Sequence, residues 1–592
     1  MSRTAAVILL VASAALPAGD YNPNLGIFGV GPAYGEWMLG IEKEEYEPAI
    51  RQRLLQVGCT SVRMGFNWPS IEPREGEYHF EIADDDVNWY AEHGIEMVGL
   101  VVNTPDWASP TGKQTHAYAA KKSKFPAVER MCENLARHFA GRVDQWEWWN
   151  EPNGYGWNLE HGYNNVDEYL PFLRAAYKGF HKGNPDCLVA IGGLDNSDGW
   201  SYIMLEKMYE AGGRDCFDAV ADHPYSKKGD TENTKKKLRK LRGILLAHGD
   251  GHKPLYLTEY AWKVSEIGEE ARIKAMRETF AIYSDPEFSY VKNAQYLGIG
   301  DFENPFDGFA LCDVNLRPRE LFYAFQGYPR TPGDIRVSRV TIDRLTQTTA
   351  TITWQTNIPG TTELRYGVAA ADGGALDKCV SLEGERAAHV VTIEGLKPGT
   401  RYAFSPVSAR PDRSREHVMT PEAFRTPAFG VLVNAGFEGS TVGLPDGWQS
   451  VGRSVWKRVS REKPTDVHGG EYAQFVVVDG SHAFDDWGYQ FVGAKPGAKC
   501  AFSAWTKAAC TAKGKEDNIR HAVGIDPAGG RDPDAASVIW SDDVAGDDTW
   551  GRRTASAVAT GDTVTVFFRV KSKEPVGALQ YFWVDDAALS VR

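Results

Sequence analysis

The chain has few basic residues for its size and no long run of them. Its 592 residues include 65 Lys and Arg against 79 Asp and Glu, for a formal net charge of -14. A surface with that balance repels polyanions, so neither a nucleic-acid partner nor an anionic membrane is expected. The composition favours a neutral or cationic partner.

Cysteine is scarce, and its spacing matches no metal site. The eight cysteines stand at positions 59, 132, 187, 216, 312, 379, 500 and 510. None of them forms the close pairs that ligate zinc, and we expect no cofactor for catalysis. Cys500 and Cys510 could bridge neighbouring strands in an exported protein.

Long apolar runs are also missing, apart from one near the start. Arg3 precedes an apolar stretch over 5–16 and a small-residue region around Leu16-Pro17-Ala18, which is the pattern of a signal peptide. A dozen apolar residues are too few to cross a bilayer, which needs about 20. We therefore expect a signal peptide over 1–19, a secreted, extracellular or periplasmic protein, and no membrane span.

What the chain does have is length, tryptophan and an alternating pattern. A chain of 592 residues is too long for one core and predicts about three domains. Over 20–330, apolar runs typical of strands alternate with helical stretches, which indicates parallel βα units. The expected strands are 25–30, 61–66, 96–103, 145–150, 188–192, 219–224, 255–258 and 294–300. The expected helices are 46–58, 83–94, 127–139, 166–182, 202–211, 234–249 and 266–283.

Eight such units predict a (β/α)8 TIM barrel, with its active site where the strands end. A doubly wound open sheet is the alternative, although no Gly-rich phosphate turn follows the first expected strand. Two carboxylates, Glu151 and Glu259, end the fourth and seventh apolar runs. The barrel geometry places them across one cleft from each other. Burial of carboxylates that have no functional role would be unfavourable there.

Two glutamates across a cleft, without metal ligands, fit cleavage of a glycosidic bond. Motifs at four expected strand ends strengthen this reading: Arg63, Asn150-Glu151-Pro152, His223-Pro224-Tyr225 and Thr258-Glu259. Together they resemble the clan A glycoside hydrolases. The run from Trp146 to Asn153 (WEWWNEPN) and the segment from Val62 to Tyr78 are most similar to family 39, the β-xylosidase and α-L-iduronidase family.

The resemblance implies a retaining double displacement with Glu151 as acid/base and Glu259 as nucleophile. It also implies that Asn150 binds a sugar 2-hydroxyl and that Tyr225 steadies the nucleophile. The clan's tryptophan at the end of strand eight is not evident, and Phe302 stands near that place. Remaining expected substrate contacts are Arg63, His223, Trp107 and Trp262, of which the two tryptophans could equally be packing residues.

Two further expectations concern the neighbours of Glu151. Glu147 lies inside the same apolar run and is expected to be a buried structural partner rather than a catalyst. Trp146, Trp148 and Trp149 are expected to surround Glu151 with indole rings that disfavour its charged form.

After residue 330 the helical pattern ends and short strands follow, which predicts two all-β sandwich domains over 334–427 and 430–592. The first resembles the fibronectin type III module, with Trp354 in its core and Tyr402 as a corner. The second resembles jelly-roll carbohydrate-binding modules. That resemblance implies a structural calcium near Glu438 and Asp585, and sugar contacts from some of Trp456, Trp487, Tyr489, Trp505, Trp540 and Trp550.

The sequence thus predicts a secreted glycoside hydrolase that acts on oligo- or polysaccharides. Two alternatives remain open: a catalytically silent carbohydrate-binding or surface protein, and a transglycosylase on the same scaffold. Sugar identity, exo or endo action and oligomeric state are left open.

Overall fold

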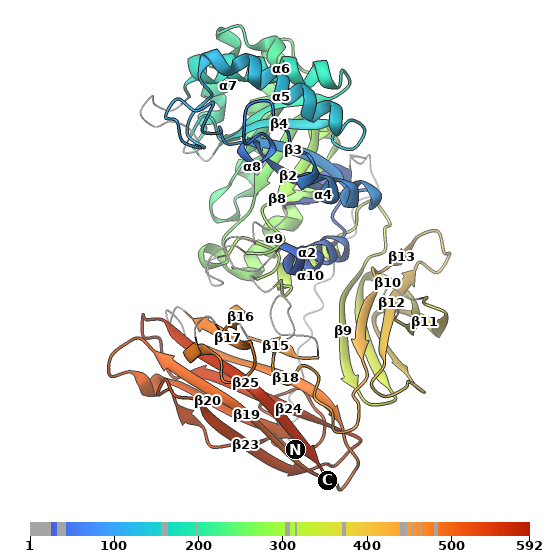
Figure 1. Ribbon diagram of the computed structural model, residues 1–592. Coiled ribbons are helices and arrows are strands. Elements are labelled where there is room, and N and C mark those ends of the chain that lie inside the picture. The colour runs from blue at the N-terminus through green and yellow to red at the C-terminus, as the bar shows by residue number, and fades with distance from the viewer. Residues whose placement is uncertain are drawn as a thin grey trace.

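The computed structural model describes residues 25–31, 43–154, 164–196, 198–301, 308–313, 316–369, 375–438, 447–452, 455–461, 464–478 and 483–592. The expected signal peptide, 1–19, and Phe302 lie outside the described residues. Figure 1 shows a helical upper part that surrounds a sheet and two β-rich parts below it. No helix among the described residues is long and apolar enough to cross a membrane.

The upper part is an eight-stranded parallel barrel, which confirms the expected fold. Its hydrogen-bonded order is β1-β8-β7-β6-β5-β4-β3-β2. The ring closes between β1 and β2, where the Thr60 amide donates to the Phe28 carbonyl at 3.2 Å. The strands are β1 (Gly29–Val30), β2 (Ser61–Asn67), β3 (Glu96–Val102), β4 (Gln145–Asn150), β5 (Leu188–Asp195), β6 (Ala219–His223), β7 (Leu255–Tyr260) and β8 (Val291–Tyr296).

The barrel helices follow the strands and cover them from outside (Figure 1). They are α2 (Lys43–Val57), α3 (Trp68–Ile71), α4 (Glu81–Glu92), α5 (Phe125–His138), α6 (Val166–Gly183), α7 (Trp200–Glu210), α8 (Thr231–Ala247), α9 (Val264–Ser284) and α10 (Glu320–Gln326).

The first and the eighth barrel strands differ most from expectation. The expected first strand begins as a 3-10 turn, Leu25–Phe28, and only Gly29 and Val30 pair with β8. The last strand starts at Val291 and ends at Tyr296, before Gly298, whose φ of 88° interrupts extended backbone. An apolar run alone did not locate that break, because Ile299 is buried like the strand itself.

Trp146 and Trp148 of β4 face the helical layer, not the barrel mouth. Trp146 stacks on Phe180 and meets Phe66 edge-on, and Trp148 contacts Phe172. Gly99 on β3 makes room, since a Cβ there would lie 2.6 Å from the Trp146 ring. Strand alternation sends these side chains outward and Glu147 inward. The expectation that Trp146 and Trp148 surround the Glu151 carboxyl was therefore wrong.

The lower parts are antiparallel. The first has the long β10 (Ala350–Val368) paired with β9 (Val337–Leu345), β11 (Lys378–Ile393) and β12 (Arg401–Ala409), with β13 (Glu416–Val418) and β14 (Glu422–Arg425) beside β12. Trp354 lies in its core and donates to Ser408 Oγ, and the Tyr402 hydroxyl accepts from the Lys397 amide. Both aromatic residues therefore lie where the sequence placed them.

The second lower part is a sandwich of two sheets. One sheet has the order β15-β18-β24-β20-β21, with β22 beside β20, and the other has the order β16-β17-β25-β19-β23. Their bounds are β15 (Gln449–Val451), β16 (Val455–Ser460), β17 (Tyr472–Val478), β18 (Asp485–Gly493), β19 (Lys499–Cys510), β20 (Ile519–Asp526), β21 (Ile539–Trp540), β22 (Val544–Ala545), β23 (Gly551–Val558), β24 (Thr563–Ser572) and β25 (Gln580–Val591).

A disulfide between Cys500 and Cys510 is excluded, because both residues lie on β19 and all eight cysteines are free. Ten residues of extended strand span about 33 Å, far beyond the reach of a disulfide.

The two lower parts pack together through aromatic side chains. Tyr489, Phe491 and Phe567, from β18 and β24, join the same apolar cluster as Trp354, with Trp487 and Trp540 packed against it. Trp456 lies at the centre of the sandwich itself. Trp456 and Tyr489 are thus buried, and the expectation that they are exposed sugar contacts was wrong.

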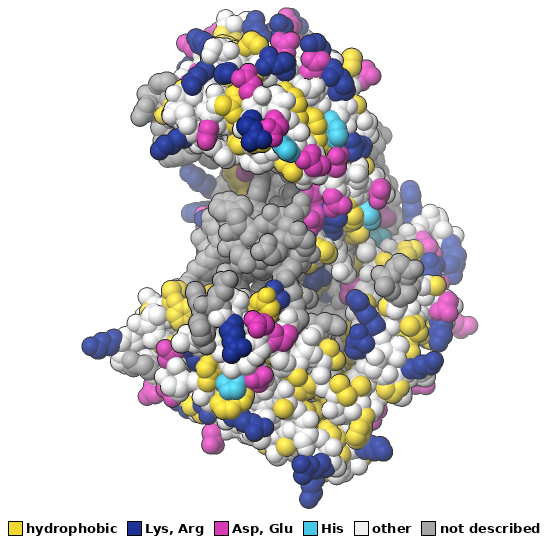
Figure 2. Space-filling view, in the orientation of Figure 1, with side chains coloured by type: hydrophobic (Ala, Val, Ile, Leu, Met, Phe, Trp, Pro, Cys, Tyr) yellow, Lys and Arg dark blue, Asp and Glu magenta, His cyan; other side chains and the backbone are white. Residues whose placement is uncertain are grey.

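Charges of both signs are interspersed over the face shown in Figure 2. No large single-sign patch stands out among the described residues on that face, which agrees with the absence of basic runs in the sequence.

We expect Trp146→Ala to lower the free energy of unfolding of the barrel by about 3–5 kcal/mol, because it leaves a cavity between β4 and α6. Chemical denaturation followed by far-ultraviolet circular dichroism measures the change. Leu246→Ala, at a side chain that is 59% exposed, is the matched control and should change little. Equal stability of Trp146→Ala and the parent would contradict the packing role.

Candidate active site

The motifs at the expected strand ends converge on one cluster. Arg63 comes from β2, Asn150 and Glu151 from the end of β4, His223 from β6 and Glu259 from β7. Trp149 and Glu151 have positive φ values of 82° and 46°, which are uncommon for residues other than glycine. Such strained backbone is typical of functional sites, and here it interrupts the alternation that would otherwise send neighbouring side chains to opposite faces.

Arg63 is the centre of the cluster. Its side chain is 4% exposed, and its guanidinium donates to Glu147 Oε2 at 2.7 Å and Oε1 at 2.9 Å. It also donates to Glu259 Oε1 at 2.6 Å and to Asn150 Oδ1 at 2.9 Å. One buried cation therefore holds the side chains from β4 and β7 at fixed positions.

Glu147 is the fully buried counter-ion of Arg63, as expected from its place inside the strand. Its Oε1 also accepts from the Gly193 amide at 2.5 Å and from the Thr258 hydroxyl at 3.0 Å. Gly193 must be a glycine, because a Cβ there would lie 2.2 Å from His223 Nε2 and 2.6 Å from Glu147 Oε1. The floor of the site is thus a buried, closely packed polar network.

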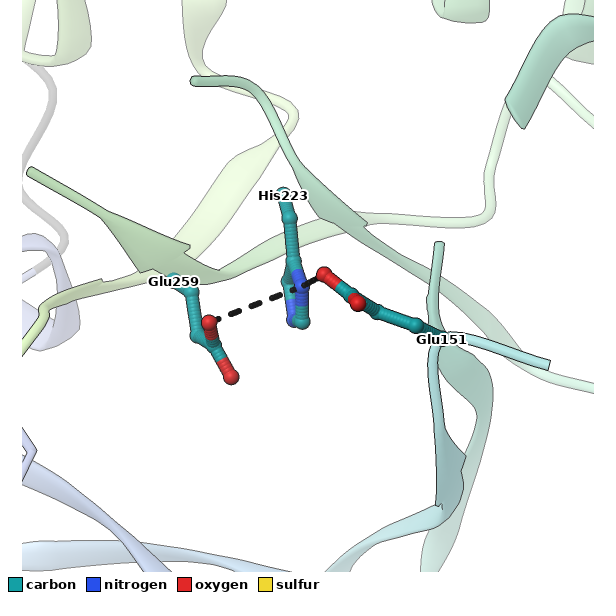
Figure 3. A group of neighbouring side chains, drawn as sticks. All are labelled: Glu151, His223 and Glu259. Atoms are coloured by element: carbon teal, nitrogen blue, oxygen red, sulfur yellow. Dashed lines mark hydrogen bonds and ion pairs between the residues drawn. The ribbon is translucent and has the colours of Figure 1, made fainter. Parts of the chain in front are cut away.

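His223 lies between the two glutamates, as Figure 3 shows. Its Nδ1 is 2.9 Å from Glu151 Oε1 and 3.7 Å from Glu259 Oε2, and its Nε2 is 3.2 Å from Thr258 Oγ1. Since Thr258 donates its only hydroxyl proton to Glu147, its oxygen must accept from His223 Nε2–H. Nδ1 is then the atom that can exchange a proton with Glu151.

The charges around His223 favour its protonated form. Burial lowers the pKa of His223, but attraction to Glu259 and the hydrogen bond with Glu151 outweigh it and raise the pKa above its ordinary value. The imidazole is therefore held by carboxylates on its Nδ1 side and by Thr258 on the other.

Glu259 is stabilised in its ionised form. Burial raises the pKa of Glu259, but the charges of His223 and Arg63 and the hydrogen bond from Tyr225 lower it below the ordinary value. The Tyr225 hydroxyl donates to Glu259 Oε2 at 2.9 Å. Burial and the nearby Glu259 charge raise the pKa of Tyr225 well above its usual range, so it remains a donor.

The two carboxyl groups face each other at short range and stay accessible. An oxygen of Glu151 lies within 4.8 Å of an oxygen of Glu259, and a His223 nitrogen lies within the same distance of both. Their side chains are 23% and 17% exposed, whereas His223 is fully buried. Three such ligands could hold a metal ion, but the Arg63 guanidinium already neutralises Glu259 on one side, which disfavours a second cation.

The other expected contacts lie less centrally. Trp107 is half-buried, donates to the Glu72 carbonyl at 3.1 Å and has the Lys124 ammonium over its ring. Trp262 is buried against Tyr260 and Tyr296. Substrate contact by these tryptophans stays a prediction, as does contact by Phe302, which lies outside the described residues.

His116 was not expected at the site from the sequence. Backbone hydrogen bonds between Thr104 and Thr115, at 2.7 and 3.0 Å, fold the long loop after β3 back on itself. His116 then stacks on Trp149, and its Nδ1 lies 3.2 Å from Asn103 Oδ1. Burial lowers the pKa of His116, although the Glu151 charge acts in the opposite direction. A single histidine in a long loop has no sequence pattern that reveals this approach.

The residues expected to hold calcium lie around one turn of the second sandwich. Glu438 accepts from the Glu471 amide at 3.1 Å, and Asp585 Oδ2 accepts from the His468 and Gly469 amides, both at 2.9 Å. Burial raises the pKa of Asp585 to about 6. An all-oxygen donor set at one turn suits a hard cation, and calcium binding stays a prediction.

Known proteins resemble parts of the chain. Residues 336–423 match the family model of the fibronectin type III domain, which confirms that expectation. A family 39 glycoside hydrolase from the gut symbiont Bacteroides cellulosilyticus WH2 is 17% identical, with 65% of this chain and 81% of that chain covered and a TM-score of 0.45.

Two further structures are similar to this chain. A family 39 β-xylosidase from Caulobacter crescentus is 16% identical, with 60% of this chain and 84% of that chain covered and a TM-score of 0.41. The module TmCBM61, in complex with β-1,4-galactotriose, is 19% identical, with 28% of this chain and all of that chain covered and a TM-score of 0.22. The substrates and ligands named there are those of the other proteins.

The pKa shifts predict how stability depends on pH. A raised His223 pKa contributes stability that is complete below the ordinary value of 6.5 and is lost as pH rises through the folded-state value. A lowered Glu259 pKa contributes stability that is present above 4.5 and lost as pH falls.

We expect His223→Asn to be most destabilising between pH 4.5 and pH 6.5, the ordinary pKa values of Glu and His. The difference in melting temperature between the variant and the parent protein should shrink as pH rises past neutrality. Thermal unfolding across a pH series measures this, with His252→Asn at an exposed loop position as control. A deficit that is constant with pH would contradict a charge-stabilised His223.

For the turn at 468–471, we expect Ca²⁺ to raise the melting temperature and a chelator to reverse the gain. Asp585→Asn should abolish the response, whereas Asp532→Asn, at an exposed position on the same domain, should keep it. A melting temperature of the parent protein that is indifferent to both Ca²⁺ and chelator would rule out a structural calcium.

Proposed function

We propose that the protein is a retaining glycoside hydrolase that cleaves O-glycosidic bonds of oligo- or polysaccharides. The observation that carries the proposal is the pair of accessible carboxyl groups, Glu151 and Glu259, with oxygens within 4.8 Å of each other. Retaining enzymes hold their two carboxyl groups about 5–5.5 Å apart, whereas inverting enzymes leave about 6.5–9.5 Å for a water molecule. The short separation favours direct attack on the sugar.

In the first step, Glu259 attacks the anomeric carbon while Glu151 gives its proton to the departing glycosidic oxygen. The C–O bond to the leaving group breaks and an ester bond to Glu259 forms. In the second step, Glu151 takes a proton from water, the water oxygen attacks the anomeric carbon, and Glu259 leaves as a carboxylate. Protons and charges balance over the two steps, and no co-reactant besides water is needed.

The contacts support this division of roles. Glu259 is held by Arg63 and Tyr225, and both are donors that favour the ionised nucleophile. Glu151 has neither contact, and its carboxylate instead meets His223 Nδ1, a group that can both give and take a proton. Asn150 is held by Arg63 through its carbonyl oxygen, so its amide NH2 is directed by that bond and can donate to a sugar hydroxyl.

We also propose that Glu147 is a positioning residue for this chemistry and not a catalyst. It is fully buried and its oxygens are occupied by Arg63, Gly193 and Thr258. Its charge keeps Arg63 in the orientation that serves Glu259 and Asn150. Export with a signal peptide over 1–19 remains part of the proposal and rests on the sequence pattern alone.

We expect Glu259→Gln to lower kcat on aryl glycosides by about 10³-fold or more, because no nucleophile remains. Glu151→Gln should slow substrates with poor leaving groups by about 10²–10⁴-fold and spare the first step for good leaving groups. Steady-state and burst kinetics on a series of aryl glycosides measure both effects.

Glu266→Gln, at an exposed position on α9, is the matched control for loss of a carboxylate. Full activity of either Glu259→Gln or Glu151→Gln would contradict the proposal. Absence of turnover by the parent protein, with glycan binding kept, would instead favour the catalytically silent alternative. Analysis of the products separates transfer to water from transfer to a sugar, since both reactions share the covalent intermediate.

A further inference from the structure

The barrel-facing side of α8 includes a lysine where apolar residues are usual. Thr234, Lys237, Leu238 and Leu241 are buried at helical spacing, and Lys237 is only 5% exposed. Lysine is rarely buried to this degree, because an ammonium removed from water must be hydrogen-bonded and near a negative charge. The contacts of Lys237 therefore show what its burial accomplishes.

The Lys237 ammonium donates to two backbone carbonyls that follow different barrel strands. One is the carbonyl of Tyr225, at 2.7 Å, two residues after β6, and the other is the carbonyl of Asn196, at 2.5 Å, directly after β5. Burial lowers the pKa of Lys237, and the nearby Asp222 charge acts in the opposite direction. One cation from the helical layer thus joins the chain segments that leave β5 and β6.

Asp222, on β6, supplies the negative charge in this layer and is fully buried. Strand alternation turns it towards the helices, since the next residue, His223, faces the two glutamates of the site. Asn196 Nδ2 donates to Asp222 Oδ2 at 2.9 Å. Burial raises the pKa of Asp222 to about 6, against the hydrogen bond from Asn196 and the charge of Lys237. Loss of the ammonium alone would therefore leave a buried carboxylate without its cation.

The backbone of Tyr225 is fixed at both of its ends. Its amide donates to the His223 carbonyl at 2.8 Å, which closes a tight turn before the tyrosine. Its carbonyl accepts from Lys237, and the next residue, Ser226, has its Oγ 2.9 Å from Thr234 Oγ1. Thr234 lies one helical turn before Lys237, so the same side of α8 makes both contacts. The direction of the Tyr225 side chain is therefore set by α8.

The Asn196 carbonyl connects the same ammonium to the segment that follows Glu151. Asn153, two residues after Glu151, is fully buried, and its side chain bonds the backbone of Asp195 twice. Asn153 Nδ2 donates to the Asp195 carbonyl at 3.0 Å, and the Asp195 amide donates to Asn153 Oδ1 at 2.9 Å. Asp195 is the neighbour of the residue that Lys237 holds. The supports of both strand ends thus meet at one buried cation.

We propose that Lys237 is a positioning residue for the nucleophile: it fixes the backbone of Tyr225 and thereby keeps the Tyr225 hydroxyl on Glu259. That hydroxyl donates to Glu259 Oε2 at 2.9 Å, and such a donor favours the ionised carboxyl. The Lys237 ammonium is bonded to backbone carbonyls, so it acts on Glu259 through Tyr225. The inference rests on the proposed hydrolase function, because that function makes Glu259 the nucleophile.

The test compares Lys237→Met with Tyr225→Phe in the full chain, through the pH profile of kcat/KM on an aryl glycoside. The acidic limb of that profile reports ionisation of the nucleophile in the free enzyme. We expect Lys237→Met to move this limb to higher pH by about one unit, because a hydrogen bond to a charged carboxyl is weakened. In a Tyr225→Phe background the same change should add little, since the two side chains act as a unit.

Lys236→Met, at an exposed position on the same helix, is the matched control and should leave the profile unchanged. If Lys237→Met does not fold, the double variant Asp222→Asn/Lys237→Met removes the carboxylate together with its cation and should show the same shift.

A crystal structure of the folded variant supplies a measurement without turnover, and we expect the Tyr225 hydroxyl to have left Glu259. An acidic limb that stays in place, an equal shift in the Tyr225→Phe background, or a Tyr225 hydroxyl still bonded to Glu259 would each overturn the proposal. Absence of turnover by the parent protein would contradict the hydrolase proposal instead, and the crystal structure would still decide whether Lys237 holds Tyr225.

Discussion

The structure of the site depends on one buried cation placed between two carboxylates. Removing a guanidinium and two carboxylates from water is costly unless each is paired and hydrogen-bonded. Arg63 meets that condition through Glu147 on one side and Glu259 on the other, with Asn150 as a third acceptor. The arrangement ties β2, β4 and β7 together, so the geometry of the barrel mouth and the charge state of the site are set by the same contacts.

This constraint explains why Glu151 and Glu259 have different surroundings, although each lies at the end of an apolar run. Glu259 accepts hydrogen bonds from Arg63 and Tyr225, and the Arg63 guanidinium compensates its negative charge. Glu151, after a strained turn at Trp149, lies beyond the reach of the guanidinium and meets His223 instead. An environment that separates the properties of two nearby carboxyl groups is the general way in which one site performs acid and nucleophilic steps.

The sequence predicted the barrel, the two β domains and the members of the central cluster, because periodicity and strand-end motifs are local patterns. It did not reveal which way Trp146 and Trp148 face, because that follows from their packing against α6. It also missed His116, whose position follows from backbone pairing of Thr104 with Thr115. In the second sandwich the aromatic residues could be counted but not assigned to faces. Tyr489 is buried in a cluster shared with the fibronectin type III domain, whereas Trp550 lines a groove. The sequence alone does not distinguish these two positions.

The most direct test of the central claim is the configuration of the sugar as it is first released. Proton NMR of the reaction, recorded before mutarotation, distinguishes the two anomers of the product. A double displacement through Glu259 predicts that the first product has the same anomeric configuration as the substrate. Release of the opposite anomer would contradict a direct attack by Glu259 and require a water molecule between the two carboxylates.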